Sequence, residues 1–300
     1  MQPISFTFTG RKEFMKILIP YLLRERKASK LKKHVWFLHT NKQEDIDYAI
    51  QTTKDYPGFF EVLDIGIRPD YSTHLYQTAY QHFTEPGQVY IKIDDDIVFI
   101  EEGALGRLAK FKVDNPEYFI VLGNIINNGV CAHLHQRFGA LVAPDFFTWA
   151  QDNNYQIVHG IKSDTAETSM VRLHMSFFEL WKAKNLDRYK FYKWGLWEKQ
   201  FWVSINLFAV LGDDLATLGA RLTSCAASDE CFLTEEAPAL LNKANCIYGD
   251  CLVSHYSFRM QNEIFDRHPE LLTMYENICN KECGGVHPTS AGVEGERHVR

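Results

Sequence analysis

Apolar positions in the N-terminal part of the chain follow two alternating spacings, which predict strands separated by amphipathic helices. Short apolar runs predict strands over residues 4–9, 34–39 and 59–65, and in the run that begins at Val89. Apolar residues three and four positions apart predict the intervening helices over residues 13–26, 45–54 and 72–83. This alternation is typical of an α/β fold, a Rossmann-type sandwich with a mostly parallel central sheet.

The rest of the chain repeats these patterns at less regular intervals. It predicts helices over residues 103–112 and from Asp229, and strands over residues 118–122, 203–212 and 247–257. The mixed stretch 133–187, with its aromatic residues and histidines, predicts loops. We expect one domain over residues 1–278 and a flexible tail over 279–300, which is rich in glycine, histidine and charge.

Composition narrows the class of protein. The chain has 300 residues, of which 46% are hydrophobic and 23% charged, as in ordinary soluble globular proteins. Its net charge of −6 argues against nucleic acid or an anionic membrane surface as a partner. No segment has the roughly 18 consecutive apolar residues of a membrane span, and the N-terminus does not resemble a secretory signal. We therefore expect a cytoplasmic protein without an integral membrane segment.

Two common phosphate-binding motifs are absent. No GxGxxG follows the first predicted strand, and no GxxxxGK[ST] occurs in the chain. The sequence therefore indicates neither a dinucleotide-binding fingerprint nor a P-loop NTPase.

The seven cysteines are an odd number, which favours reduced thiols over a disulfide framework. Two groups combine cysteine and histidine in the way that a zinc site would. They are Cys246, Cys251 and His255, and Cys279, Cys283 and His287. Neither contains a paired CxxC, so ordinary core cysteines are the favoured interpretation of both groups.

Asp94, Asp95 and Asp96 end a strongly apolar run, and apolar residues resume directly after them. Parallel strands present ligand-binding residues at their carboxyl ends. Clustered, desolvated carboxylates remain ionised together only if a cation compensates them. Because oxygen ligands suit Mg²⁺ and Mn²⁺, we predict a divalent metal site that serves a phosphorylated substrate. The alternative is a polar turn or a helix cap.

Four motifs in order resemble those of the GT-A-fold, nucleotide-sugar-dependent glycosyltransferases. They are the Asp-x-Asp of Asp94-Asp95-Asp96, the glycine of Val210-Leu211-Gly212-Asp213, the acidic pair Asp229-Glu230 and the C-terminal His255. The similarity extends over roughly residues 4–260. The acidic pair reads Asp-Glu, where the family more often has Glu-Asp.

The resemblance implies metal-dependent transfer of a sugar from a nucleotide-diphosphate sugar, most simply a UDP-sugar, to a hydroxyl acceptor of unknown class. It implies Mn²⁺ or Mg²⁺ on Asp94, Asp96 and His255. Residues 1–130 would bind the donor and residues 131–278 the acceptor. The implied nucleotide-contacting residues are Thr7, Thr9, Gly10, Arg11, Arg68, Asp94 and Asp95.

A general base must take the proton of the acceptor hydroxyl, and Glu230 is our first candidate and Asp229 the second. A base at this position implies inversion at the anomeric carbon, and the alternative is a retaining mechanism, which needs no such base. The alternative role for the pair is to complement the dipole at the start of a helix. His255 has its own alternative, as a histidine of the core. Trp194, Trp197 and Trp202 are candidates for stacking on an acceptor sugar, or for core packing.

Two other classes remain open at this stage. A sugar-phosphate nucleotidyltransferase also uses acidic metal ligands on an α/β sheet. It would normally carry a glycine-rich phosphate loop after the first strand, of which Thr9-Gly10-Arg11-Lys12 is only a faint counterpart. A non-catalytic carbohydrate- or nucleotide-binding protein would not need the acid triplet, the acidic pair and His255 together.

Overall fold

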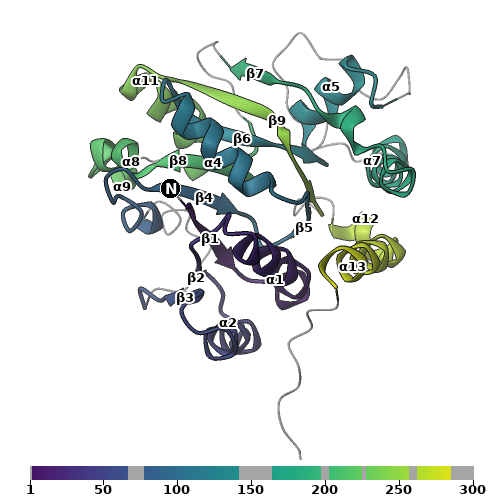
Figure 1. The fold of residues 1–300 in the computed structure, drawn as a ribbon, viewed down its shortest axis with the longest axis horizontal. Helices are drawn as coiled ribbons and strands as arrows, with labels where there is room; N and C mark the ends of the chain where they lie inside the picture. Colours follow the sequence, from purple (N-terminus) through teal and green to yellow (C-terminus); the bar gives the residue numbers. More distant parts are fainter. Residues whose placement is uncertain are drawn as a thin grey trace, which may run out of the picture.

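The structure, a computed structural model, describes residues 2–66, 78–141, 164–196, 203–224, 228–256 and 262–284. Within these ranges the chain forms one nine-stranded mixed sheet flanked by helices (Figure 1). This architecture confirms the α/β, Rossmann-like sandwich that the sequence predicts.

The strands are β1 (Ile4–Thr9), β2 (Lys33–Leu38), β3 (Phe60–Leu63), β4 (Val89–Ile93), β5 (Ile97–Ile100), β6 (Tyr118–Ile126), β7 (Lys193–Leu196), β8 (Leu207–Leu211) and β9 (Ala244–His255). Their order is β3-β2-β1-β4-β8-β6-β9-β5, and β7 pairs with β9. β3, β2, β1 and β4 form a parallel block, and β6 is parallel to β9. β8 is antiparallel to both β4 and β6, and β5 and β7 are antiparallel to β9.

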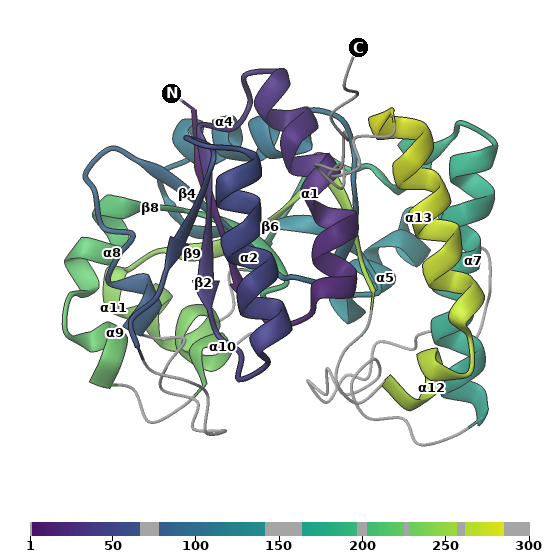
Figure 2. The same cartoon turned by 90° about the horizontal axis from the view of Figure 1, so that it is seen from below.

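The central strands are buried on both faces, since every residue of β1, β4, β5 and β6 is buried. β5 is a continuous apolar run, whereas β1 alternates apolar residues with the buried Ser5, Thr7 and Thr9. The longer helices are α1 (Lys12–Lys27), α2 (Gln43–Asp55), α4 (Ala104–Asp114), α5 (Gly129–Arg137), α7 (Asp164–Lys182) and α13 (Pro269–Cys283). α1 lies between α2 and α13, and α7 stands beside α13 at the far end (Figure 2).

Shorter helices occur between the later strands and after β9. They are η1 (Leu186–Tyr189), α8 (Gly212–Leu218), α9 (Arg221–Ser224), α10 (Asp229–Cys231), the π-helical turn η2 (Phe232–Glu236), α11 (Ala237–Leu241) and α12 (Asn262–Asp266). α10, η2 and α11 follow one another without a break, so the acidic pair Asp229-Glu230 opens a helical segment, as predicted.

The prediction of loops over residues 133–187 is wrong where this stretch is described. α5 continues to Arg137, and α7 runs from Asp164 to Lys182. α7 buries Met170, Leu173 and Phe177, and these positions have the three-to-four spacing of an amphipathic helix. The many aromatic residues and histidines of this stretch concealed that periodicity.

Several predicted boundaries also change. β6 extends to Ile126 and β9 starts at Ala244, because both strands have partners on two sides over most of their length. β8 starts only at Leu207. α13 continues to Cys283, inside the tail that we expected to be flexible, because Ile278 and Cys279 pack into the core.

Some predictions fall on residues outside the described ranges. Of the helix expected over 72–83, only residues 78–80 are described as helical. Arg68, Trp197, Trp202, His287 and residues 285–300 lie outside them as well. The six cysteines that are described are all free thiols, as expected. Among the described helices, none combines the length and the apolar character needed to cross a membrane.

Candidate functional site

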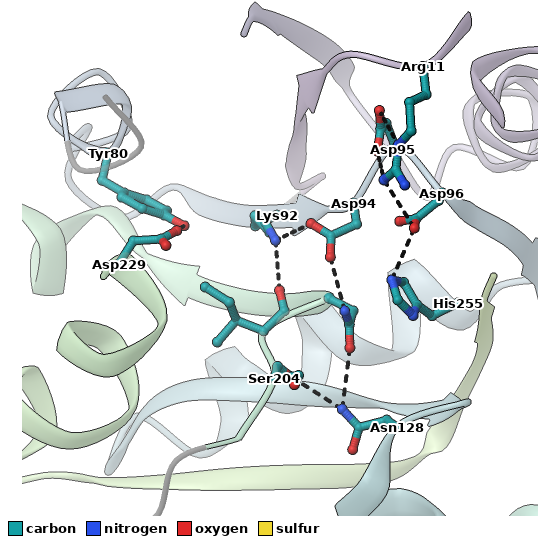
Figure 3. A network of polar contacts seen from close by, with 12 residues as sticks. Arg11, Tyr80, Lys92, Asp94, Asp95, Asp96, Asn128, Ser204, Asp229 and His255 are labelled. Carbon is teal, nitrogen blue, oxygen red and sulfur yellow. Dashed lines mark hydrogen bonds and ion pairs between the residues drawn. The ribbon is translucent and has the colours of Figure 1, made fainter. Parts of the chain in front are cut away.

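Strand ends gather around residues 94–96, and the pairing of the strands explains why (Figure 3). The triplet joins the end of β4 to the start of β5. β5 is antiparallel to β9 with Ile97 opposite His255, so the last residue of β9 lies beside Asp96. β1 is parallel to β4, so Arg11, which follows β1, reaches the same edge of the sheet.

Asp96 and His255 form the most deeply buried part of this cluster. His255 Nε2 lies 3.2 Å from Asp96 Oδ2, and the two side chains are 3% and 1% exposed, respectively. Asp96 Oδ1 has no hydrogen-bond partner among the described residues, so the polar contacts of this carboxylate are all made by Oδ2. One ligand atom each from Asp94, Asp96 and His255 lies within 4.8 Å of the others. This spacing allows the three side chains that the sequence nominated to share one ion.

Asp94 is held in place from two sides. Lys92, a buried residue of β4, forms an ion pair with Asp94 Oδ1 and donates to the carbonyl of Ile205 at 2.8 Å. Asn206 Nδ2 donates to Asp94 Oδ2 at 3.1 Å, and the main-chain N–H of Asp94 donates to the carbonyl of Asn206 at 2.8 Å. Asp94 is therefore oriented by the residues that precede β8.

A second polar side chain extends this support. Asn128 Nδ2 lies 3.3 Å from Asn206 Oδ1, and Asn128 Oδ1 accepts from the N–H groups of Val130 and Cys131 at the start of α5. Sequence reasoning did not assign a role to Lys92, Asn128 or Asn206. For Lys92 and Asn206 the only signal was a polar residue amid apolar ones, which does not indicate the partner that it meets in the fold.

Asp95 points toward Arg11. Arg11 Nε lies 3.1 Å from Asp95 Oδ1, and Arg11 Nη2 pairs with the same oxygen. The same Nη2 lies 3.0 Å from Asp96 Oδ2. Burial raises the pKa of Asp95 to about 6, although the charge of Arg11 opposes this rise.

Asp96 responds differently to the same surroundings. Burial would raise its pKa, but the charges of Arg11 and His255 hold that pKa below the usual aspartate range. Asp96 thus stays ionised, as a metal ligand must.

Asp229 lies opposite the triplet, at the start of α10. Tyr80 Oη donates to Asp229 Oδ2 at 3.2 Å (Figure 3). Burial raises the pKa of Asp229, the charge of Lys92 and the Tyr80 hydrogen bond oppose this rise, and the charge of Asp94 adds to it. Glu230 is the next residue along, and its carbonyl accepts from Thr234 Oγ1 at 2.7 Å.

The charges in this region do not balance. The carboxylates of Asp94, Asp95, Asp96 and Asp229 lie near two basic side chains, Arg11 and Lys92. If all four carboxylates are ionised, two negative charges remain, which is the charge that a divalent ion would neutralise.

The predicted nucleotide-contacting residues of the first strand divide into two groups. Thr7 and Thr9 lie inside β1 and are fully buried, and Thr9 Oγ1 donates to the carbonyl of Phe37 at 3.1 Å. Gly10 lies beyond the strand, where a Cβ atom would sit 3.7 Å from Asp95 Oδ2. Gly10 and Arg11, rather than the two threonines, therefore adjoin the acid cluster.

The remaining candidates lie elsewhere. Trp194 belongs to β7, and the guanidinium of Arg137 lies 5.0 Å from the centre of its ring. Cys246, Cys251 and His255 are spread along the single extended strand β9, at about 3.3 Å per residue, so they cannot converge on one zinc ion.

No model of a known protein family matches the chain, and no curated protein is similar enough to count as a match.

Proposed function

We propose that this protein is a glycosyltransferase that uses a divalent metal and a nucleotide-diphosphate sugar. The observation that carries the proposal is the convergence of Asp94, Asp96 and His255 at the strand ends. Asp229 faces the same region, and all four of these residues belong to the sequence motifs that resemble the GT-A family, which also include Glu230 and Gly212. The donor class, UDP-sugars, comes from that resemblance.

The residues of the site fit a divalent ion. Asp96 is a buried carboxylate whose Oδ2 meets Arg11 and His255, whereas its Oδ1 has no hydrogen-bond partner among the described residues and is open to a further cation. Two carboxylates and one imidazole are a ligand set that Mn²⁺ accepts readily, and carboxylates also suit Mg²⁺. When bound, the ion would neutralise charge on the departing nucleoside diphosphate.

Asp229 is our preferred general base, in place of Glu230. Its raised pKa makes it a stronger proton acceptor than an exposed aspartate, and Tyr80 fixes one of its oxygens. In this role Asp229 takes the proton of the acceptor hydroxyl as that oxygen attacks the anomeric carbon. A base that acts on the attacking hydroxyl gives an inverted product.

The test is release of the nucleoside diphosphate from a panel of UDP-, GDP- and TDP-sugars, with Mn²⁺, with Mg²⁺ and with EDTA. We expect release from one donor class in Mn²⁺ and loss of release in EDTA. Full activity in excess EDTA would contradict the metal dependence. Release of pyrophosphate from a nucleoside triphosphate and a sugar phosphate would identify a nucleotidyltransferase instead.

A matched control separates the metal site from general damage. Asp96→Asn removes one charge from the proposed site. Asp250→Asn also removes one charge, but from a residue of β9 that forms ion pairs with Arg107 and Lys190. Only the first change should abolish release of the nucleotide.

A further inference from the structure

Arg11 occupies an unusual position for a residue beside a cation site. Its guanidinium contacts Asp95 through Nε and Nη2, and it reaches Asp96 through Nη2 alone. Arg11 Nη2 and His255 Nε2 approach the same oxygen, Asp96 Oδ2, at 3.0 Å and 3.2 Å. The guanidinium therefore meets the oxygen at which the proposed metal ligands converge.

A metal ion and this guanidinium repel each other. An ion bound to Asp96 Oδ2 at about 2.1 Å would lie within about 5 Å of Arg11 Nη2. Repulsion at that distance disfavours a state in which the ion and the Arg11 guanidinium both contact Asp96, particularly where burial limits screening. The Asp96 contact involves one nitrogen and the Asp95 contact two, so Asp96 is the partner that Arg11 can give up while it stays attached to Asp95.

We propose that Arg11 is an internal counter-ion that neutralises Asp95 and Asp96 in the metal-free protein. A divalent ion displaces its guanidinium from Asp96. The released edge of the guanidinium then binds the diphosphate of the donor. The metal half of this inference concerns this chain's own residues. The diphosphate half rests on the proposed function.

The exposure of Arg11 suits such a role. Its side chain is 33% exposed, whereas Asp95 is 7% and Asp96 1% exposed. The acids are thus fixed in the protein, and the arginine has an open side toward solvent. Arg11 also precedes α1 without capping it through its side chain, so a movement of the guanidinium costs no helix-capping hydrogen bond.

The displacement predicts opposite effects of one substitution on two ligands. In Arg11→Gln, Mn²⁺ alone should bind roughly tenfold or more tightly, because a repelling charge is gone. In EDTA the same variant should melt at a lower temperature than the unchanged protein, because its acids have lost their counter-ion. UDP should raise the Mn²⁺ affinity of the unchanged protein, and this enhancement should shrink in Arg11→Gln because the diphosphate loses a partner.

The measurements are Mn²⁺ titration by electron paramagnetic resonance, with and without UDP, and thermal melting in EDTA. Arg137→Gln is the matched control: it removes the same charge from α5, where the guanidinium lies over Trp194, and should leave Mn²⁺ affinity unchanged. Arg11→Lys keeps the charge and should bind Mn²⁺ less tightly than Arg11→Gln.

The outcomes distinguish the two levels of the proposal. Equal or weaker Mn²⁺ binding in Arg11→Gln, with clear binding in the unchanged protein, overturns the displacement of Arg11. Failure of both proteins to bind Mn²⁺ overturns the metal site and this inference with it. Tighter Mn²⁺ binding in Arg11→Gln with an undiminished effect of UDP overturns the diphosphate half alone.

Discussion

Lys92 and Asn206 show how single buried polar residues shape the site. Lys92 is a charged residue in the middle of the buried strand β4, where an unpaired ammonium would be strongly disfavoured. Its ion pair with Asp94 and its bond to the carbonyl of Ile205 make its burial tolerable, and they fix Asp94 in return. These residues position a candidate ligand without being ligands themselves.

The first prediction concerns the metal ligands. Asp96→Asn should weaken Mn²⁺ binding by roughly 100-fold or more, because loss of a charged ligand costs several kcal/mol. His255→Gln should weaken Mn²⁺ binding clearly and lower the melting temperature only slightly. Isothermal titration calorimetry and thermal melting of the same samples provide the comparison. A large loss of melting temperature with an unchanged Mn²⁺ titration would identify His255 as a histidine of the core.

The second prediction concerns the acidic pair. Asp229→Asn should lower kcat by roughly 10²-fold or more with donor binding nearly unchanged, as expected for loss of a general base. Glu230→Gln should be milder. Steady-state kinetics on both variants decides the order, and the reverse order would assign the base to Glu230. A product with the anomeric configuration of the donor would contradict the inverting mechanism.

At the scale of elements, the antiparallel strand β8 is the decisive feature of the sheet. It runs between β4 and β6, with Leu207 opposite Ile93, and so brings the residues before it to the end of β4. Directly after β8 the main chain passes close to the main chain of Glu85, and this approach requires the absence of a side chain at Gly212. A Cβ atom at this position would lie 2.1 Å from the carbonyl oxygen of Glu85.

Gly212→Ala should therefore destabilise the fold, because the clash is with main chain that cannot move aside without cost. We expect a loss of about 2–3 kcal/mol of unfolding free energy, measured by urea denaturation. Gly123→Ala is a graded comparison, since its new Cβ would first meet the side chain of Leu207 at 3.0 Å. A smaller loss for Gly212→Ala than for Gly123→Ala would show that the segment around Glu85 yields easily.

At the scale of the whole molecule, three buried histidines lie in three different elements. His34 lies in β2, His135 in α5 and His174 in α7, and burial lowers the pKa of each to about 3. Each is tied to a neighbour: Ser5 Oγ lies 2.7 Å from His34 Nδ1, Asn124 Oδ1 lies 2.5 Å from His135 Nε2, and Tyr275 Oη lies 2.7 Å from His174 Nδ1. All are therefore neutral in the native state at physiological pH.

These histidines predict a loss of stability in acid. The unfolded chain takes up a proton on each near pH 6.5, while the folded protein resists until about pH 3, so the stabilising contribution is complete above pH 6.5 and disappears as pH falls toward 3. His135→Gln removes one such group. The unchanged protein should lose more unfolding free energy than this variant as the pH falls from 6 to 4. The difference between their unfolding free energies should therefore decrease by roughly 1.4 kcal/mol for each pH unit. Urea denaturation across this range measures it, and the raised pKa of Asp95 cancels because both proteins contain it. A difference that stays constant with pH would show that His135 is not neutralised by burial.

The sequence by itself determined most of the elements and nominated the residues of the acid cluster. The runs that became β4 and β5 are apolar at nearly every position, a pattern typical of strands that are buried on both faces. The acids at the end of β4 were visible because clustered carboxylates next to buried residues need a cation. His255 was nominated from its place in the order of motifs.

Only the tertiary structure decided which polar residues meet. Arg11 is separated from Asp95 by 84 positions in sequence, and the parallel pairing of β1 with β4 brings them together. Asn206 reaches Asp94 because β8 is antiparallel to β4, which no local pattern specifies. The spacing of apolar residues along the chain indicates which face of a strand or helix is buried. The partners of a polar residue depend instead on the order and direction of the strands. These are set by the packing of the whole sheet, and for that reason the Arg11 counter-ion became visible only in the fold.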